Sequence, residues 1–463
     1  MKTSKTSPIP RHRLARLAHL GSLAGSVAGG MLAEGLRQVA QGNMPRAADL
    51  VLTPANARRV ADKLSELRGA AMKVGQLLSM DAGDLLPPEL AAILSRLRAD
   101  ARPMPMSQVV RAMEQAFGQG WEKTFHRFSF TPMAAASIGQ VHAAIMHGER
   151  HLALKIQYPG VKKSIDSDVD NVATLLRISR LVPEELDLEP LLQEAKRQLH
   201  EEADYLREAA HLQRFAMLLE DAPEFLVPGV EETLTRENIL TMDLLAGEPI
   251  DSLSSATQTT RDRVVGLLLG LLFRELFDFR LIQTDPNFAN FLYNAQTGQL
   301  GLLDFGATRR YTGTVTEAYR GLLGAALHQD RAAMAECAQA IGYFKEDIHA
   351  RQRAAVMELF ILATEPARTR GRFDFGASDL ALRIRDAGMA LSFDQGYWHT
   401  PPADAVFLHR KLGGLYLLAA RLRAKVDVRA ILERHLTRAC LLYTSPSPRD
   451  NIANRVCRLQ LEK

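Results

Sequence analysis

The chain has 463 residues, of which 57 are Lys or Arg and 53 are Asp or Glu, so its formal net charge is +4. A composition of 47% hydrophobic and 24% charged residues is typical of globular proteins and excludes a largely disordered chain, while the near-neutral charge argues against a nucleic-acid partner. The three cysteines have no ligand spacing, so the sequence indicates neither a disulfide framework nor a zinc site and favours a reducing compartment.

The first 45 residues are basic and rich in Gly and Ala, with no acidic side chain before Glu34. Gly21, Gly25 and Gly29 recur at every fourth position, which on a helix gives a stripe suited to close helix packing in lipid. We therefore expect residues 1–45 to associate with a membrane and to support a homodimer through these glycines. A soluble helix or arm and an organelle transit peptide are open alternatives.

Residues 46–120 are expected to form a helical extension, because apolar residues recur there at three- and four-residue spacing. Lys73 and Gln76 lie on one face of this helix, where a solvated face is the alternative to a functional role. A sheet-bearing segment is expected at 121–250, with a hairpin turning at His147–Arg150, helices over 164–219, and strands at 229–232 and 238–244.

Residues 251–440 are expected to be mainly helical. Within them Val264–Phe273 is the longest apolar run, but it is too short to span a membrane and is predicted to be a buried core helix. Regular helical periodicity ends near Arg438, and the segment 441–463 resembles a translated adapter sequence, so we expect it to be non-native and exclude it from the fold.

Two motifs of the sheet-bearing segment suggest phosphate binding. The run Ala134, Ala135, Ala136 and Ser137, followed by Gly139, offers small residues whose backbone amides can approach phosphate closely. Lys155 lies in an apolar strand, one strand and a turn after Gly139, where a kinase carries the lysine that contacts the nucleotide phosphates. A solvent-facing strand lysine is the alternative.

Two further motifs follow in the order found in kinases. Asp285 and Asn290 have the spacing of a kinase catalytic loop, with Asp as general base and Asn as a magnesium ligand, although Gln283 and Thr284 replace the kinase His and Arg. Asp304 opens an Asp-Phe-Gly sequence and would also bind magnesium. Helical periodicity resumes soon afterwards without an Ala-Pro-Glu motif, so the segment that binds peptide substrates in protein kinases is missing or short.

Together these motifs resemble the UbiB family of atypical, aarF-domain-containing kinases, which is linked to ubiquinone synthesis. The resemblance covers about residues 10–436 and rests on the motifs above with Lys73-x-Gly-Gln76 and Glu202-Ala-Asp204. It implies an α+β, protein-kinase-like bilobal fold whose N-terminal helical extension covers the nucleotide cleft. It also implies that Lys73 pairs with Glu202 and Asp204 and blocks protein substrates.

Within the helix expected at Leu192–Leu219, Glu208 is the favoured partner of Lys155, and Glu201 and Glu202 are the other candidates. Backbone groups near Met242 and Leu244 are expected to bind adenine.

The implied function is an ATPase or small-molecule kinase that uses ATP or ADP and Mg²⁺ and supports ubiquinone biosynthesis. The expected location is cytoplasmic and peripheral to the inner membrane, or to the mitochondrial inner membrane in a eukaryote. Membrane lipids or quinone precursors, and enzymes of quinone synthesis, are the expected partners. A non-catalytic, nucleotide-sensing lipid-binding scaffold or chaperone is the alternative, and an ordinary protein kinase is disfavoured by the missing Ala-Pro-Glu motif.

Overall fold

The computed structural model describes residues 69–71, 73–75, 103–178, 188–344, 348–391 and 402–444. The chain forms two compact units, Met1–Gly247 with Leu292–Ala307, and Glu248–Phe291 with Thr308–Lys463. Segment 1–45 with its three glycines, Gln76, and the chain beyond Thr444 lie outside the described residues. No helix in the described ranges has the length and apolar character needed to cross a bilayer.

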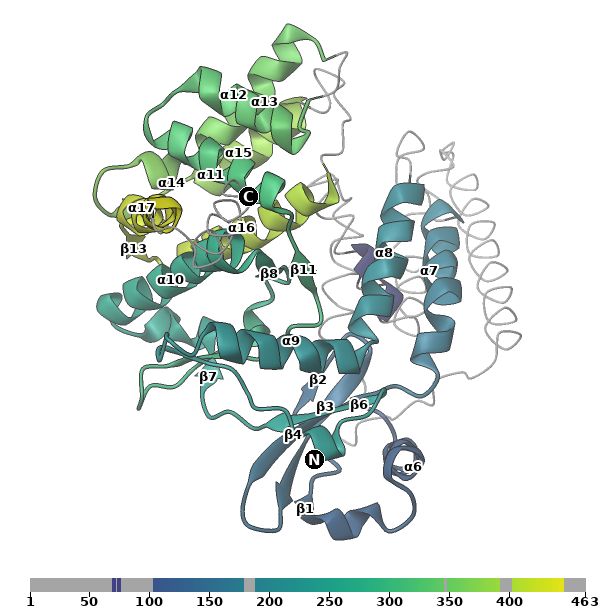
Figure 1. The fold of residues 1–463 in the computed structure, drawn as a ribbon. Helices are drawn as coiled ribbons and strands as arrows, with labels where there is room; N and C mark the ends of the chain where they lie inside the picture. Colours follow the sequence, from purple (N-terminus) through teal and green to yellow (C-terminus); the bar gives the residue numbers. More distant parts are fainter. Residues whose placement is uncertain are drawn as a thin grey trace, which may run out of the picture. The chain divides into compact units, whose positions relative to one another are not determined.

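The first unit combines helices with short strands (Figure 1). Its elements are α6 (Met106–Phe117), η3 (Trp121–Thr124), β1 (Phe125–Phe128), β2 (Ala134–Ala135), β3 (Gly139–Met146), β4 (His151–Gln157), α7 (Val161–Ile178), α8 (Glu189–Glu202), α9 (Tyr205–Leu218), β5 (Phe225–Leu226), η4 (Glu232–Leu234), β6 (Ile239–Asp243), β9 (Phe291–Tyr293) and β10 (Leu300–Leu302). Strand β9 begins at the last residue of the other unit.

The main sheet has the order β1-β3-β4-β6, with β2 added beside β3, and all of these pairs are antiparallel. The expected hairpin is confirmed: β3 and β4 are joined by a turn in which Gly148 (φ 98°) and Glu149 (φ 64°) are both left-handed. The N–H of Glu149 donates to the carbonyl oxygen of Met146 (3.1 Å) and closes the turn, in which Gly148 adopts a positive φ without steric cost. This pairing places Lys155 in a central strand, opposite Val141 on one side and Leu240 on the other.

The side chains of β4 lie on two faces of the sheet, because successive side chains of a strand point to opposite faces. Leu152, Leu154 and Ile156 are buried in an apolar cluster with Val109 and Met113 of α6. Full burial of each such side chain contributes about 1.5–3 kcal/mol to folding. The alternate positions, including Lys155, therefore face away from this core.

The helix expected at Leu192–Leu219 is instead two helices, α8 and α9, separated at Ala203 and Asp204. The Asp204 carboxylate accepts a hydrogen bond from the backbone N–H of Arg207 (3.0 Å) and is the N-cap of α9. Asp is among the preferred N-cap residues because its side chain satisfies an amide that has no partner within the helix. The break starts a new helix three residues before Glu208.

The strand expected at 229–232 is also different. It is reduced to a single bridge between Val230 and Met242. The Glu231 side chain accepts a hydrogen bond from the N–H of Thr233 (3.3 Å) and caps the 3₁₀ turn η4. This local side-chain-to-backbone bond competes with the sheet ladder and ends the pairing.

The second unit is mainly helical. Its elements are β7 (Glu248–Pro249), η5 (Ile250–Ser255), α10 (Gln258–Phe273), the π-helical turn η6 (Arg274–Phe279), β8 (Leu281–Gln283), η7 (Phe288–Asn290), β11 (Thr308–Arg310), α11 (Gly313–Leu327), α12 (Arg331–Ile341), α13 (Ala350–Ala363), α14 (Glu365–Arg368), β12 (Phe373–Asp374), α15 (Leu380–Met389), α16 (Ala403–Arg421), β13 (Lys425–Val426) and α17 (Val428–Thr444).

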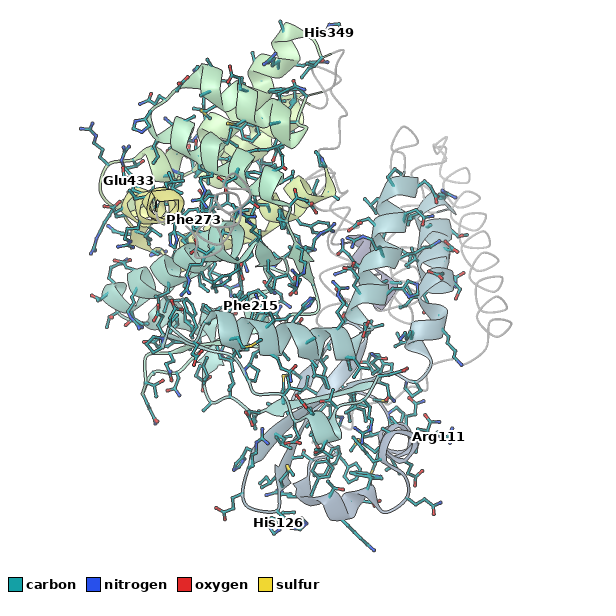
Figure 2. The ribbon with its side chains drawn as sticks, viewed as in Figure 1. Arg111, His126, Phe215, Phe273, His349 and Glu433 are labelled. Carbon is teal, nitrogen blue, oxygen red and sulfur yellow. The ribbon has the colours of Figure 1, made fainter. Side chains whose placement is uncertain are left out.

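The apolar run Val264–Phe273 is confirmed as a core helix, since most of its side chains are buried, including Phe273 at the end of α10 (Figure 2). Helix α17 continues to Thr444, which is beyond the expected end near Arg438. Pro446 follows two residues later and cannot continue a helix, because it lacks a backbone N–H.

Gly139 provides a test of the fold, because it leaves no room for a side chain. A Cβ at this position would lie 2.3 Å from the carbonyl oxygen of Ile156 in β4. We expect Gly139→Ala to cost about 1–3 kcal/mol of stability, because the hairpin must open to admit the methyl group. The measurement is the melting temperature. Gly388→Ala is the control: no atom lies within 4 Å of its Cβ, and the melting temperature should not fall. Equal melting temperatures for both variants would contradict the close approach.

Candidate active site

Lys155 is the centre of a buried charge cluster in the first unit. Its Nζ lies 2.9 and 3.0 Å from the two carboxylate oxygens of Glu208 and 3.0 Å from Oδ2 of Asp304. The expected pairing of Lys155 with Glu208 is thus present in the structure. The ammonium group also lies 5.4 Å from the ring centroid of Tyr205, within the range of a cation–π contact.

The protonation of this cluster follows from its burial and its charges. Burial alone would lower the pKa of Lys155, but Asp304 and Glu208 raise it, and the result is well above its usual value. Burial raises the pKa of Glu208 to about 7, although Lys155 opposes this change. Burial would also raise the pKa of Asp304, but Lys155 and the N–H of Gly306 lower it below its usual value. Lys155 therefore stays protonated, and of its two carboxylate partners Asp304 is the stronger acid and Glu208 the weaker.

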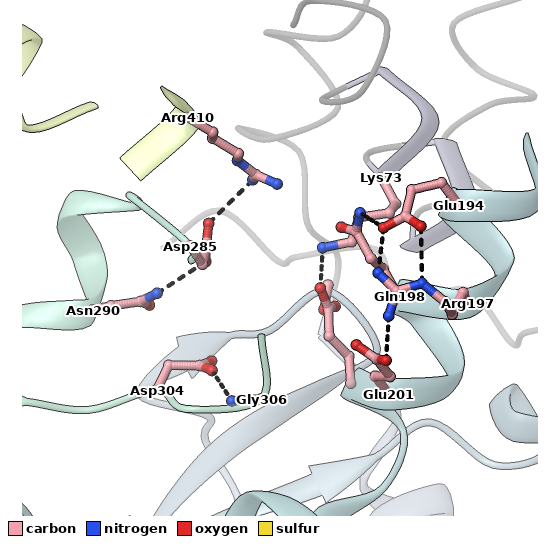
Figure 3. A network of polar contacts seen from close by, with 12 residues as sticks. Lys73, Glu194, Arg197, Gln198, Glu201, Asp285, Asn290, Asp304, Gly306 and Arg410 are labelled. Carbon is pink, nitrogen blue, oxygen red and sulfur yellow. Dashed lines mark hydrogen bonds and ion pairs between the residues drawn. The ribbon is translucent and has the colours of Figure 1, made fainter. Parts of the chain in front are cut away.

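Helix α9 fixes both the carboxylate of Glu208 and the segment that carries Asp304. The ring of Phe305 lies 4.4 Å from that of Phe215 on α9, and its carbonyl oxygen is 3.2 Å from Nδ1 of His211. Asp304 turns back to accept a hydrogen bond from the N–H of Gly306 (3.0 Å; Figure 3). A single helix therefore orients two of the three charged groups.

The Ala-rich loop forms a short hairpin with β3, which separates it from Lys155 in the same sheet. Ala134 and Ala135 pair with Val141 and Gln140 of β3, and the N–H of Ala136 donates to the carbonyl oxygen of Gly139 (2.9 Å). Both strand alanines are exposed, and their side chains are no larger than a methyl group. Small exposed residues at such a turn allow a phosphate to approach the backbone.

Glu202 joins this loop to the helical segment that carries Lys73. One carboxylate oxygen of Glu202 accepts from Lys73, and the other accepts from the hydroxyl of Ser137 (2.7 Å). A Cβ on Gly69 would lie 2.9 Å from the carbonyl oxygen of Ser137, so the helical segment packs directly on the loop. The contact implied between Lys73 and Glu202 is present, whereas Asp204, the other implied partner, caps α9.

The groups expected to bind a base at Met242 and Leu244 are largely engaged in the sheet. Met242 pairs with Ala153, and the N–H of Leu244 donates to the carbonyl oxygen of His151 (3.0 Å). The amide of Leu244 is therefore not free to bind a base, which corrects the expectation for this donor. A strand residue has to pair its backbone groups with a neighbour when water is excluded.

Asp285 is the centre of a polar cluster in the second unit. Its Oδ2 accepts from Nδ2 of Asn290 (2.9 Å), and its Oδ1 accepts from the guanidinium of Arg410 (3.2 Å; Figure 3). The backbone carbonyl of Asp285 accepts from Nε2 of Gln283 (2.9 Å). Both the side chain and the backbone of Asp285 are therefore held by hydrogen bonds.

Arg410 and Lys411 of α16 were not identified from the sequence, since they lie far along the chain from Asp285 and belong to no motif used here. A signal was present for Lys411, which is four residues from both Phe407 and Leu415 and thus lies on the apolar face of its helix. A charged residue on such a face needs a buried partner. The sequence does not show which residue provides it.

Asp304 in the first unit and Asn290 in the second unit each carry a side-chain oxygen of a kind that binds magnesium. Mg²⁺ prefers carboxylate and amide oxygens, and it is commonly held by one or two carboxylates with substrate phosphates and water. Within the described ranges there is no group of three or more His, Cys, Asp or Glu side chains that could hold a metal alone.

Comparison with known proteins gives consistent matches. Residues 96–338 match the ABC1 atypical kinase-like domain. The chain is 40% identical to "Atypical kinase COQ8, mitochondrial" of Saccharomyces cerevisiae over 92% of its own length and 85% of that protein. It is 38% identical to "Atypical kinase COQ8B, mitochondrial" of Rattus norvegicus over 93% of its length and 81% of the relative. Its fold resembles Rv3197 of Mycobacterium tuberculosis, solved with erythromycin, with a TM-score of 0.57 and 26% identity over 80% of this chain and 93% of that one.

The raised pKa of Glu208 predicts a dependence of stability on pH. The folded protein holds this proton more tightly than the unfolded chain, so the stabilisation is present at low pH and is lost as the pH rises through about 7. We expect the melting temperature of the wild type, relative to that of Glu208→Gln, to fall between about pH 5 and pH 8.

Glu220→Gln is the control for this prediction, because Glu220 is an exposed residue just beyond the end of α9. The difference in melting temperature between the wild type and Glu220→Gln should not change between about pH 5 and pH 8. A constant difference for Glu208→Gln as well would show that this carboxyl titrates normally.

Proposed function

Because the chain belongs to the family of ABC1 atypical kinase-like domains, we propose that it binds ATP with magnesium and transfers the terminal phosphoryl group to water or to a small molecule. The observation that carries this proposal is the pairing of Lys155 with both Glu208 and Asp304. Kinases use this arrangement of Lys, Glu and Asp to hold the nucleotide phosphates in a reactive position.

In this proposal the first unit binds the nucleotide. Glu208 would orient the Lys155 ammonium, which would contact the phosphates, and backbone amides of the Ala-rich loop would bind the phosphates as well. Asp304 and Asn290 would hold magnesium, which neutralises charge on the phosphates when it is bound. Asp285 would orient the acceptor hydroxyl or water and take its proton.

Two features support an acceptor other than a protein. Only six residues, 307–312, separate Gly306 from the start of α11, which leaves no segment of the kind that binds peptides in protein kinases. Lys73, Glu202 and Ser137 also tie a helical segment to the Ala-rich loop. We propose that this contact restricts access to the loop, as the resemblance to the UbiB family implies.

The same resemblance supports a role in ubiquinone biosynthesis at a membrane surface, with lipids, quinone precursors or enzymes of that pathway as partners. The two relatives described above carry "mitochondrial" in their names. We propose that the basic segment 1–45 mediates peripheral association with the inner membrane. Gly21, Gly25 and Gly29 of this segment would also support a homodimer.

Asp304→Asn should remove magnesium-dependent nucleotide binding, because it takes a carboxylate from the metal that neutralises the phosphates. The measurement is the thermal shift produced by ATP with and without magnesium. Asp386→Asn, an exposed position on α15, is the control and should respond as the wild type does. A magnesium-dependent shift that survives in Asp304→Asn would overturn the assignment of Asp304.

Asp285→Asn should leave nucleotide binding nearly intact and lower turnover by roughly 10²–10⁴, the usual contribution of a general base. Nucleotide hydrolysis by the purified protein, with and without magnesium and liposomes, provides the measurement. If the wild type binds nucleotide without turnover under all these conditions, the non-catalytic scaffold is the correct alternative. A joint loss of binding and turnover in the variant would instead assign Asp285 a structural or metal-binding role.

A further inference from the structure

Lys411 is a buried cation that the proposed chemistry does not use. It lies in the middle of α16 and is 2% exposed. Lysine is almost never fully buried without partners, because its ammonium group loses its hydration. Its Nζ lies 2.9 Å from Oε1 of Gln283 and 3.4 Å from Oε2 of Glu275. These partners explain how the cation is tolerated in the core.

Glu275 provides the balancing charge from the π-helical turn after α10 and is 1% exposed. Burial raises the pKa of Glu275 to about 7, while Lys411 and the backbone of Gln283 act in the opposite direction. Single π-helical turns often occur at functional sites, because they redirect a side chain relative to a regular helix. Here the turn places a carboxylate beside the strand that leads to Asp285.

Gln283 connects this buried pair to Asp285. Its side-chain oxygen accepts from Lys411, and its side-chain nitrogen donates to the backbone carbonyl of Asp285 (2.9 Å). An amide has one accepting end and one donating end, so a cation at the oxygen fixes which way the group points. Lys411 therefore determines that the donor end of Gln283 faces Asp285.

Helix α16 also contacts the Asp285 loop at two other positions. Arg410 binds Oδ1 of the Asp285 carboxylate at 3.2 Å. A Cβ on Gly414 would lie 2.2 Å from Cβ of Pro286, so the helix and the loop are in direct contact there. The same helix therefore constrains the side chain of Asp285, its backbone and the following residue.

We propose that Lys411 is a positioning residue for the reaction. It orients the side-chain amide of Gln283, and this amide holds the backbone of Asp285. Gln283 occupies the position of the kinase histidine. The inference rests on the proposed function, because it assigns Asp285 a role in turnover. Glu275 has a supporting role, since its charge allows the lysine to be buried. Neither Lys411 nor Glu275 needs to touch a substrate.

Gln283→Met tests the link directly, because it keeps the length of the side chain and removes only the amide. We expect kcat to fall about 10–100-fold with KM for ATP within about twofold of the wild type, as for a small displacement of a catalytic group. Amide hydrogen exchange, followed by mass spectrometry, should become faster in peptides that cover residues 281–290.

Lys411→Met alone would leave the carboxylate of Glu275 buried without a positive charge beside it, which is strongly destabilising. The double variant Lys411→Met with Glu275→Gln removes both charges together, so that no buried charge is left uncompensated, and the glutamine keeps an acceptor for the backbone N–H of Gln283. If Lys411 positions Gln283, the double variant melts near the wild type but shows the same lowered kcat and faster exchange as Gln283→Met. Wild-type exchange and turnover in the double variant would overturn the inference.

Leu432→Ala, a buried substitution on α17, is the control for a general loss of stability and should not change exchange in residues 281–290 selectively.

If the wild type shows no turnover, the proposed function fails. The exchange measurement then still decides the inference, because faster exchange of this segment in the double variant supports positioning and unchanged exchange overturns it.

Discussion

The buried ammonium group of Lys155 is the constraint on which the nucleotide-binding half of this protein depends. A cation in the core is tolerated only when carboxylates balance it, and Lys155 is balanced by Glu208 and Asp304. These partners lie 53 and 149 residues further along the chain. The fold of the first unit must therefore bring three distant segments together at this lysine.

The break between α8 and α9 makes this arrangement possible. Asp204 caps the new helix, so that Glu208 lies in its first turn and points to Lys155, while Glu202 at the end of the preceding helix binds Lys73 and Ser137. In a continuous helix, the directions of the Glu202 and Glu208 side chains would be fixed relative to each other. The capped break instead gives each one a separate target, one in the charge cluster and one at the Ala-rich loop.

In the second unit, side chains from other elements hold Asp285 in place. Asp285 lies on a loop, and loops lack the regular hydrogen bonds that fix a helix or strand. Arg410 and Asn290 hold its carboxylate, and Gln283 holds its backbone. The buried pair of Lys411 and Glu275 supports Gln283 in turn. The role proposed for Asp285 requires its side chain to be held within a fraction of an ångström, and these hydrogen bonds restrict its position.

The sequence by itself determined the features that local pattern encodes. The apolar strand that carries Lys155, the hairpin turn, the apolar run of α10 and the order of the Lys155, Asp285 and Asp304 motifs could all be recognised, because each depends on neighbouring residues. Only the tertiary structure decided the contacts of Lys411 with Gln283 and of Glu202 with Ser137, which join residues 128 and 65 positions apart. No periodicity links such residues, since packing of separate elements alone brings them together. The break at Asp204 also escaped prediction, because apolar spacing continues across it and the capping hydrogen bond decides where the helix begins.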